Sequence, residues 1–477
     1  MVSKWSKDDA LIWLSGGALV LGFLMVAGLI LVIVVHGLGR FWPQELTLYE
    51  LRDGRIVLGH ETSRVSVRTA GLSGERSVAY RLRVRTGDRE RFPAEYVWLE
   101  EGRVAWRDAP REAVVVEQVR GGDVFGFLES FVDDGTVVAR GYEAVRAHYR
   151  EQSPELERLR RQRALSIVLS FADGRQHTVS LANVHRIYAP NAMTTWTRIR
   201  HYMGGAWSYL WSPPRDQNRL GGVYPAIFGT AAMVILMSVV VMPFGALAAF
   251  YLREYGNPGP FLNVVRIAVN SLAGVPSIVF GVFGLGFFVY YLGGTLDRLF
   301  FPAELPEPTF GRGGILWCAL TLVLLTLPVV IVAVEEGLAG VPPGLREASH
   351  ALGATRFETL WRVVVPVVLP SILTGLILSV ARAAGTVAPL MITGVVAFSA
   401  ELPVDGTWPF VHLEREFMHL GFHIFDTGFR PDGGEASLPM AYTSTLLLLA
   451  IVVALNAAAI GLRSRLRRRY SLAAAGA

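Results

Sequence analysis

The sequence predicts an all-α polytopic membrane protein that carries an inserted α/β domain outside the membrane. Hydrophobic residues make up 52% of its 477 residues, the profile of a membrane protein with a sizeable polar part. Six segments are apolar over the roughly 20 residues that a spanning helix needs, and a long polar stretch separates the first from the second. We therefore expect an N-terminal anchor helix (1–39), the inserted domain (40–215), a membrane core (216–470) and a short tail (471–477).

The six predicted transmembrane segments are separated by polar interruptions. Two lysines precede the first segment, as in a secretory signal, but its apolar run of about 25 residues is too long for one and no small-residue cleavage pattern follows. We therefore expect an uncleaved anchor. The segments are Leu11 to Val35, Tyr224 to Leu252, Phe261 to Leu292, Ile315 to Val334, Val367 to Phe398 and Met440 to Leu462.

Basic residues predict which side each end faces, because loops rich in Lys and Arg stay in the cytoplasm. A cluster of arginines follows the sixth segment, and six crossings return the N-terminus with its lysines to the same side. The inserted domain then lies outside the cytoplasm, and the loop after the fourth segment lies in the cytoplasm. We expect a multi-pass membrane protein with both termini inside. The arginines are Arg463, Arg465, Arg467, Arg468 and Arg469.

Hairpin signals run through residues 40–215. Asp-Gly pairs at 53–54, 134–135 and 173–174 each separate two alternating apolar runs, which is typical of tight turns between antiparallel strands. Residues 78–84 alternate apolar side chains with arginine, as a strand with one wet face does. A charged helix is expected from Ser153, and an aromatic amphipathic helix from Thr194 to Trp211 at the outer membrane surface.

The polar stretch 335–366, between the fourth and fifth segments, is too regular to be an ordinary loop. Pro342 and Pro343 stand where a helix can begin, and Gly353 can end that helix in a left-handed turn. A second short helix is expected from Thr355, until Pro366 closes the unit before the next apolar run. Apolar side chains recur at helical spacing in both helices, so a partner must cover them: Leu345, Ala348, Leu352, Phe357, Leu360, Trp361 and Val364.

Arg382 is the strongest polar signal inside the membrane. It lies near the middle of the fifth segment, where a guanidinium costs at least about 2.5 kcal/mol and should face a protein interior or a watered path. Its planar fork of donors suits phosphate-like oxygens, and Thr386 shares its helical face. The alternative is a structural cation bonded to carbonyls of neighbouring helices.

Two further places in the core carry polar groups. Asn270 and Ser277 stand in a Gly- and Pro-containing stretch of the third segment, typical of a broken helix that lines a solute path; packing alone is the alternative. Glu335 and Glu336 end the fourth segment, where acidic groups oppose the helix dipole. This indicates a cationic partner for them, and two solvated charges are the alternative.

Several classes of site are not expected. No lysine follows the glycines of a phosphate-binding GxxxxGK loop, so this chain should not hydrolyse ATP by that route, and no nucleic-acid partner is indicated. The single cysteine, Cys318, excludes an intrachain disulfide. His412, His419 and His423 share the last external loop, but no ligand spacing completes a metal site. We expect no catalytic residue, metal or cofactor in this chain.

The polar stretch resembles a known motif. Glu347, Ala348 and Ser349, followed by Gly353 and a hydrophobic run that ends in Pro366, are similar to the EAA loop of ABC-importer permeases. In that family the loop is the coupling element that docks in a groove of the ATPase. The resemblance implies this role for these residues and for Phe357.

Four stretches look like the phosphate-transport permeases of the PstA type: residues 221–230, 272–286, 341–366 and 381–390. The resemblance covers roughly residues 221–470 and implies a MetI-like permease core. Arg382 matches the family pattern. Members often carry arginine where Val332 stands and glutamate where Thr386 stands.

The resemblance also implies partners. Such an importer lies in the lipid bilayer of a bacterial inner membrane and contains two related permeases, of PstA and PstC type. A PstB-type ATPase dimer binds ATP and Mg on the cytoplasmic side. A PstS-type phosphate-binding protein works in the periplasm, where residues 40–215 of this chain would lie. The chain is then expected to be the permease subunit for inorganic phosphate, with the solute passing near Arg382, Thr386, Glu335, Asn270 and Ser277. A permease for phosphonate or molybdate and a membrane sensor or scaffold are the alternatives.

Overall fold

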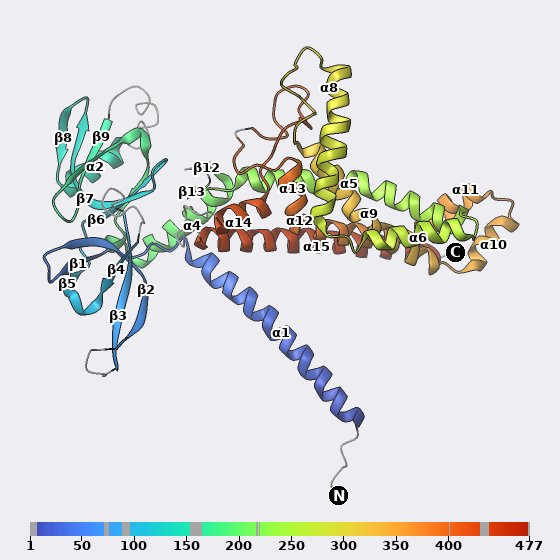
Figure 1. Ribbon diagram of the computed structural model, residues 1–477, viewed down its shortest axis with the longest axis horizontal. Helices are drawn as coiled ribbons and strands as arrows, with labels where there is room; N and C mark the ends of the chain where they lie inside the picture. Colours follow the sequence, from blue (N-terminus) through green and yellow to red (C-terminus); the bar gives the residue numbers. More distant parts are fainter. Residues whose placement is uncertain are drawn as a thin grey trace, which may run out of the picture. The chain divides into compact units, whose positions relative to one another are not determined.

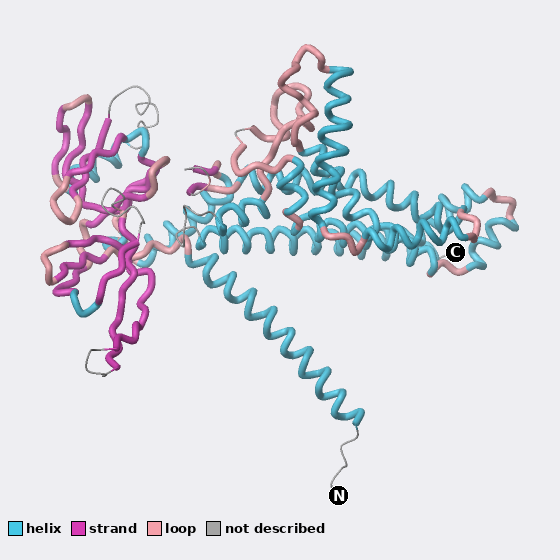
Figure 2. Tube along the Cα trace, in the orientation of Figure 1, coloured by secondary structure: helices cyan, strands magenta, loops and turns pink. Residues whose placement is uncertain are grey.

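The computed structural model describes residues 7–70, 76–87, 96–152, 165–215, 218, 220–399, 401–429 and 438–475. The chain divides into two compact units. One is Leu38–Gly222, which we call the β domain; the other, Met1–Gly37 with Val223–Ala477, is the membrane core. Strands dominate the first and helices the second (Figures 1 and 2). The predicted fold class, a helical membrane protein with an inserted folded domain, is confirmed.

The described strands of the β domain form two antiparallel sheets and a short hairpin. One sheet has the order β4-β3-β2-β1-β5; the other has the order β10-β9-β7-β6-β11, with β8 paired to β7. The strands are β1 (Thr47–Leu51), β2 (Ile56–Ala70), β3 (Arg76–Thr86), β4 (Tyr96–Glu100), β5 (Val104–Asp108), β6 (Ala113–Gln118), β7 (Asp123–Asp133), β8 (Thr136–Arg140), β9 (Leu165–Ser170), β10 (Gln176–Ser180), β11 (Val184–Tyr188), β12 (Pro214–Arg215) and β13 (Leu220–Gly221).

The predicted hairpins are confirmed. The three Asp-Gly pairs join β1 to β2, β7 to β8 and β9 to β10. Asp134 and Gly135 both have positive φ, 48° and 83°, as a tight hairpin turn requires. The alternation in β3 holds at Leu82 and Val84, which are buried while Arg81 is exposed; Tyr80, on the same face as Leu82, is exposed instead.

Two helices of the β domain were predicted. The amphipathic one is confirmed as α4 (Thr195–Trp211), which Thr194 caps by accepting from the N–H of Thr197. The charged helix from Ser153 falls on residues 153–164, outside the described part of the chain. The described helix before it is α2 (Tyr142–Gln152).

Within the described residues of the membrane core, six helical stretches are long and apolar enough to cross a membrane, as predicted. Their bounds are Ile12–Gly39, Tyr224–Tyr255, Ser277–Phe300, Ile315–Ala339, Arg356–Gly385 and Leu438–Arg465. The helices of the core are α1 (Lys7–Gly39), α5 (Tyr224–Phe250), α6 (Pro260–Leu272), α7 (Ser277–Phe283), α8 (Gly294–Phe300), α9 (Ile315–Ala339), α10 (Pro343–Ala351), α11 (Arg356–Thr359), α12 (Val365–Gly385), α13 (Ala388–Thr393), α14 (Leu420–Phe429) and α15 (Leu438–Ala475), with π-helical segments η4 (Tyr251–Tyr255), η5 (Gly284–Gly293) and η6 (Leu360–Val364).

The third predicted segment is wrong at both ends. The helix is interrupted after Leu272, and the span begins at Ser277 and runs to Phe300. Pro276 stands at the break; it lacks an N–H and disfavours helical geometry in the residue before it. α6 is thus a separate helix, and the broken geometry predicted for this stretch is present.

The fifth predicted segment is also corrected. α12 ends at Gly385, Thr386 is extended (φ −94°, ψ 124°), and the short α13 follows. At the other end Pro366 does not close the preceding unit, because α11, η6 and α12 follow one another as one helical span from Arg356. The π-helical turn η6 lies just before the proline and replaces the hydrogen-bond pattern that a proline interrupts.

The core is centred on α9, against which α5 and α12 pack. Small residues bring these helices close. Gly245 of α5 lies against Val330, while Gly375 of α12 lies against Val330 and Ala333. A side chain at either glycine would meet α9, as in other membrane helices that pack through small residues.

Candidate translocation and coupling sites

Arg382 lies in the last turn of α12, with its side chain half-buried. Among the residues that the structure describes, its guanidinium has no hydrogen-bond or ion-pair partner, while its carbonyl accepts a hydrogen bond from Thr386 Oγ1 at 2.6 Å. The alternative of a structural cation bonded to neighbouring carbonyls finds no such bond here. Five N–H donors in fixed planar geometry are therefore left for a ligand.

The packing of α12 on α9 shows which part of α9 lies beside Arg382. Gly337 faces Ser371, and Val330 and Ala333 face Gly375, so the two helices run antiparallel. Continued at the same rate along both helices, this register places Arg382 opposite residues 323–326, near the middle of α9. Arg382 ends its own helix, and its depth in the membrane stays a prediction.

Thr386, Asn270 and Ser277 contribute differently from what the sequence predicts. The hydroxyl of Thr386 donates to its own helix, so in this conformation it offers an anion no donor. Asn270 is exposed on α6, and Ser277 is half-buried at the start of α7. Within the described part of the chain, no hydrogen bond or ion pair joins either of them to Arg382.

Glu335 has the cationic partner that its position indicated. Arg266 of α6 places Nε 3.4 Å from Glu335 Oε1 and donates from Nη2 to the carbonyl of Leu252 at 3.1 Å. Glu335 stands at least nine residues from the level of Arg382 along α9, or about 14 Å of helix rise. The structure therefore separates these two predicted pathway residues.

Arg346 joins the first helix of the polar stretch to the core. Its Nη2 donates to Glu254 Oε1 at 2.7 Å and to the carbonyl of Leu338 at 3.1 Å, and its Nη1 donates to the carbonyl of Val341 at 3.0 Å. One guanidinium thus holds α10, the end of α9 and η4 together. Charge-assisted hydrogen bonds of this kind are about twice as strong as neutral ones.

Residues 341–364, which we call the coupling loop, have the predicted start and turn. α10 begins at Pro343, and Gly353 has φ +85°. Thr355 then forms a capping box with Glu358, in which each side chain accepts from the other residue's backbone N–H. Ser349 Oγ lies 2.9 Å from Thr359 Oγ1 and ties the two helices to each other. The loop is therefore a preformed unit.

The coupling loop exposes only part of its apolar side chains. Leu360 and Val364, which were also expected to need a partner, are buried within the chain, whereas Leu352 is 90% exposed, Phe357 63% and Trp361 47%. Glu347 and Ala348 are exposed beside them on α10. A soluble surface rarely leaves such large side chains uncovered together, so this face has the properties of a docking surface.

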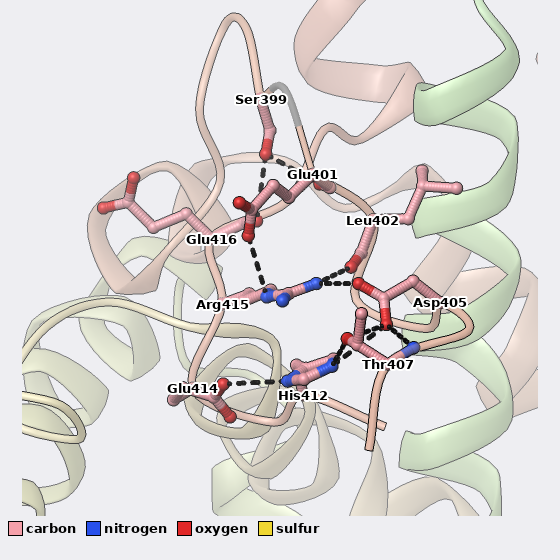
Figure 3. A network of polar contacts seen from close by, with 9 residues as sticks. All are labelled: Ser399, Glu401, Leu402, Asp405, Thr407, His412, Glu414, Arg415 and Glu416. Carbon is pink, nitrogen blue, oxygen red and sulfur yellow. Dashed lines mark hydrogen bonds and ion pairs between the residues drawn. The ribbon is translucent and has the colours of Figure 1, made fainter. Parts of the chain in front are cut away.

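A second polar structure fills the loop between α13 and α14 (Figure 3). Asp405 accepts from Thr407 N at 2.9 Å, Thr407 Oγ1 at 2.5 Å, and Arg415 Nη1 at 2.5 Å, and lies 3.1 Å from His412 Nε2. These donors hold the pKa of Asp405 well below its usual range, the bonds from Thr407 and Arg415 contributing most. The loop is therefore held by side chains rather than by strands.

The same loop caps α9. The N–H groups of Ile315 and Leu316 donate to the carbonyls of Arg415 and Leu413 at 3.0 and 3.1 Å. The first N–H groups of a helix have no partner within it, so these carbonyls complete α9. Gly229 of α5 touches the loop as well, against the carbonyl of Met418.

The three histidines considered for metal binding lie apart in role. His412 pairs with Asp405 and, through Nδ1 at 3.3 Å, with Glu414. His419 is buried, and burial lowers its pKa to about 4. Across the described residues no group of three His, Cys, Asp or Glu side chains could hold a metal ion.

The sequence did not predict the ion pair between Arg346 and Glu254 or the contact of Arg266 with Glu335. The acidic end of α9 was the available signal for Arg266. The partners of Arg346 are a carboxylate 92 residues earlier and two backbone carbonyls, which leave no local pattern.

Comparisons with known proteins show the family of this chain. Residues 241–472 match the family model described as binding-protein-dependent transport system inner membrane component. "Phosphate transport system permease protein PstA 1" of Mycobacterium tuberculosis is 33% identical over 268 residues, covering 56% of this chain and 78% of that protein. "Phosphate transport system permease protein PstA" of Yersinia pestis is 30% identical over 236 residues, covering 50% of this chain and 70% of that protein.

Among solved structures, an inward-facing MetNI methionine ABC transporter matches 57% of this chain and 99% of its own, with 17% identity and a TM-score of 0.35. The sequence relatives carry the assignment. The chain is a multi-pass inner-membrane protein. It belongs to the family of inner-membrane permease components of binding-protein-dependent, ATP-driven transport systems.

Proposed function

We propose that this permease passes inorganic phosphate, and that Arg382 is the residue which receives the anion inside the membrane. The observation that supports this most is the half-buried guanidinium, which lies opposite the middle of α9 and has no partner among the described residues. A charge at that depth is costly unless it is solvated or paired. A phosphate in transit would supply the missing acceptors, and the relatives named as phosphate permeases agree with that choice.

The pathway would be completed by a sister permease of PstC type. The breaks at Pro276 and at Thr386 interrupt two helices, and α7 and α13 meet there, since Gly281 lies against Pro389. Interrupted helices expose backbone polar groups, which membranes tolerate only in protein or beside water. Asn270, Ser277 and Thr386 remain proposed contributors along this route.

ATP hydrolysis takes place on a partner ATPase, and the coupling loop would be its docking surface. Glu347, Ala348, Ser349, Gly353 and Phe357 belong to this surface, with Pro366 in the helix that follows. The exposed Leu352 and Phe357 suit a groove of a PstB-type dimer that binds ATP and Mg. Closure of that dimer would move α10, and Arg346 would pass the movement to α9 and η4.

The proposed orientation agrees with the contacts of the core. Counted from a cytoplasmic N-terminus, the ends of the second and fourth spans and the coupling loop fall on one side, where Arg346 and Arg266 hold them together. Residues 40–215, which lie within the β domain, would then be in the periplasm, where a PstS-type binding protein would deliver phosphate.

Uptake by proteoliposomes that contain the full complex tests the substrate. Arg382→Gln should reduce phosphate uptake at least about 100-fold, the 2.7 kcal/mol scale of a lost charged contact, whereas Arg298→Gln, on the exposed end of α8, should leave it unchanged. Arg382→Lys separates charge from fork geometry, since it keeps only the charge. Unchanged uptake by Arg382→Gln in an assembled complex would remove Arg382 from the pathway.

Competition decides among oxyanions. An excess of phosphonate or molybdate should not suppress uptake of labelled phosphate if phosphate is the substrate. Stronger suppression by either competitor than by unlabelled phosphate would assign the permease to that anion instead.

A further inference from the structure

The two sheets of the β domain meet at a group of charged side chains. Strand pairing places Arg186 of β11 beside Glu117 of β6, and Glu117 beside Asp123 of β7. Arg85 of β3, in the other sheet, reaches Asp123, with Nη2 3.1 Å from Oδ2. We call Arg40, Arg85, Arg186, Arg215, Glu117 and Asp123 the arginine cluster.

The arginine cluster has more positive than negative charge. Arg186 pairs with Glu117 at 3.2 Å, and Arg85 pairs with Asp123, so each carboxylate already has one guanidinium. Arg40 and Arg215 lie within electrostatic reach of the same two carboxylates. Two guanidinium groups thus pair with the two carboxylates and two more lie in their electrostatic field, so two positive charges are in excess among the described residues.

Three titratable groups near the cluster, Tyr188, His60 and His201, do not correct this excess. Burial raises the pKa of Tyr188 far above its usual value, so this phenol stays neutral. Burial lowers the pKa of His60 to about 4, and that of His201 to about 4. At neutral pH these three side chains add neither a negative charge nor a further positive one.

Arg215 has two N–H-bearing nitrogens without a hydrogen-bond partner among the described residues. These atoms, Nε and Nη1, are also shielded from solvent. An N–H donor of a charged group that is buried without an acceptor costs free energy. Arg85 and Arg186 remain partly exposed, at 23% and 33%, so the cluster is reachable from water.

We propose that the arginine cluster is a binding site for a small inorganic oxyanion of the phosphate class. Such an anion would neutralise the excess charge and accept from Arg215 and Arg40, and the forks of several arginines match its oxygens. The site belongs to the β domain and shares no residue with the proposed pathway at Arg382. It therefore does not depend on the substrate that the permease passes.

Equilibrium dialysis of labelled phosphate against the full-length protein in nanodiscs tests the site. The Arg382→Gln background removes the proposed pathway residue, so the remaining binding reports the β domain. We expect one phosphate per chain, at least about 10-fold weaker binding in Arg215→Gln, and displacement by sulfate, which shares the tetrahedral oxyanion geometry. Arg175→Gln, at the exposed turn between β9 and β10, is the matched control and should bind as the parent does.

Arg40→Gln gives the second measurement in case Arg215→Gln does not fold, and it too should weaken binding. Absence of phosphate and sulfate binding in the Arg382→Gln protein would overturn the proposal. Equal binding by the folded Arg40 and Arg215 variants, or equal loss in Arg175→Gln, would overturn it as well. Phosphate uptake by the otherwise unaltered complex is a separate readout, so failure here is distinguishable from failure of the proposed transport function.

Discussion

Arg346 Nη2 lies 2.7 Å from Glu254 Oε1 and joins the coupling loop to the end of the second span. Both side chains are largely shielded, at 23% and 20% exposure, so solvent weakens the pair less than it does a surface ion pair. The same guanidinium also binds the carbonyl of Leu338 at the end of α9 and that of Val341 just beyond it. The contact therefore connects the coupling loop to two membrane helices.

Breaking this contact should uncouple ATP hydrolysis from uptake. Arg346→Met removes three charge-assisted bonds and should lower phosphate uptake about 10-fold while the assembled complex still hydrolyses ATP. Glu254→Gln keeps the shape of the partner and should cause a smaller loss. The measurement is uptake and ATPase rate in the same proteoliposomes, with Arg298→Met as control; parallel loss of both rates would argue for disassembly rather than uncoupling.

Gly353 should be intolerant of a side chain although it has open space around it. A Cβ meets no atom within 4 Å, yet φ is +85°, a conformation that costs a non-glycine residue about 1–2 kcal/mol. Gly353→Ala should therefore tilt the two helices of the coupling loop and weaken co-purification of the ATPase. Gly344→Ala in α10, which also has open space but an ordinary backbone, is the control. Equal ATPase recovery with both variants would count against the docking role of this turn.

Gly229 should be required for the packing of α5 against the loop between α13 and α14. A Cβ there would lie 2.2 Å from the carbonyl oxygen of Met418, and the neighbouring Thr230 Oγ1 accepts from the N–H of Leu420 at 2.9 Å. Gly229→Ala should cost about 1–3 kcal/mol, typical of overpacking, and lower the thermal midpoint in detergent. Gly16→Ala in α1, with nothing within 4 Å, should leave the midpoint where it is.

Acidification should destabilise the β domain through His60. Burial, and then the nearby Arg85, lower the pKa of His60 from 6.5 to about 4 in the folded state. Between these values the unfolded chain binds more protons, so stability is full above pH 6.5 and falls as the pH drops towards 4, by about 1–3 kcal/mol. Thermal unfolding from pH 7.5 to 5 should show this slope, and His60→Gln should make it less steep, while His201, whose pKa burial also lowers to about 4, maintains the rest. His177→Gln, on β10, is the control; a slope unchanged by His60→Gln would assign the effect to other groups.

The sequence determined the number of spans and the turn chemistry because both have short-range causes. Apolar length predicts a spanning helix, and Asp-Gly pairs predict hairpins at positions 53–54, 134–135 and 173–174. The break at Pro276 was also visible, but the fate of the residues before it was not. α6 is a separate helix because of that break, and its Arg266 contacts Glu335 and the carbonyl of Leu252, residues that no local pattern links to it.

Pro366 shows the opposite error. Local chemistry predicts that a proline closes a helix, but the structure continues through it by means of the π-helical turn η6. Arg382 could be singled out from the sequence because one charge among apolar residues is conspicuous, and its role stays a proposal. Its lack of a partner, and the joint at Arg346, depend on which helices pack together.

The two ends of α9 are held by different loops on opposite faces of the membrane. Carbonyls of Leu413 and Arg415 bind its first turn, and the Arg346 guanidinium binds its last. With 25 residues, α9 is about 37 Å long, and hydrogen bonds hold it at both ends. Neither the loop between α13 and α14 nor the coupling loop can therefore move without shifting α9 or breaking the bonds named above.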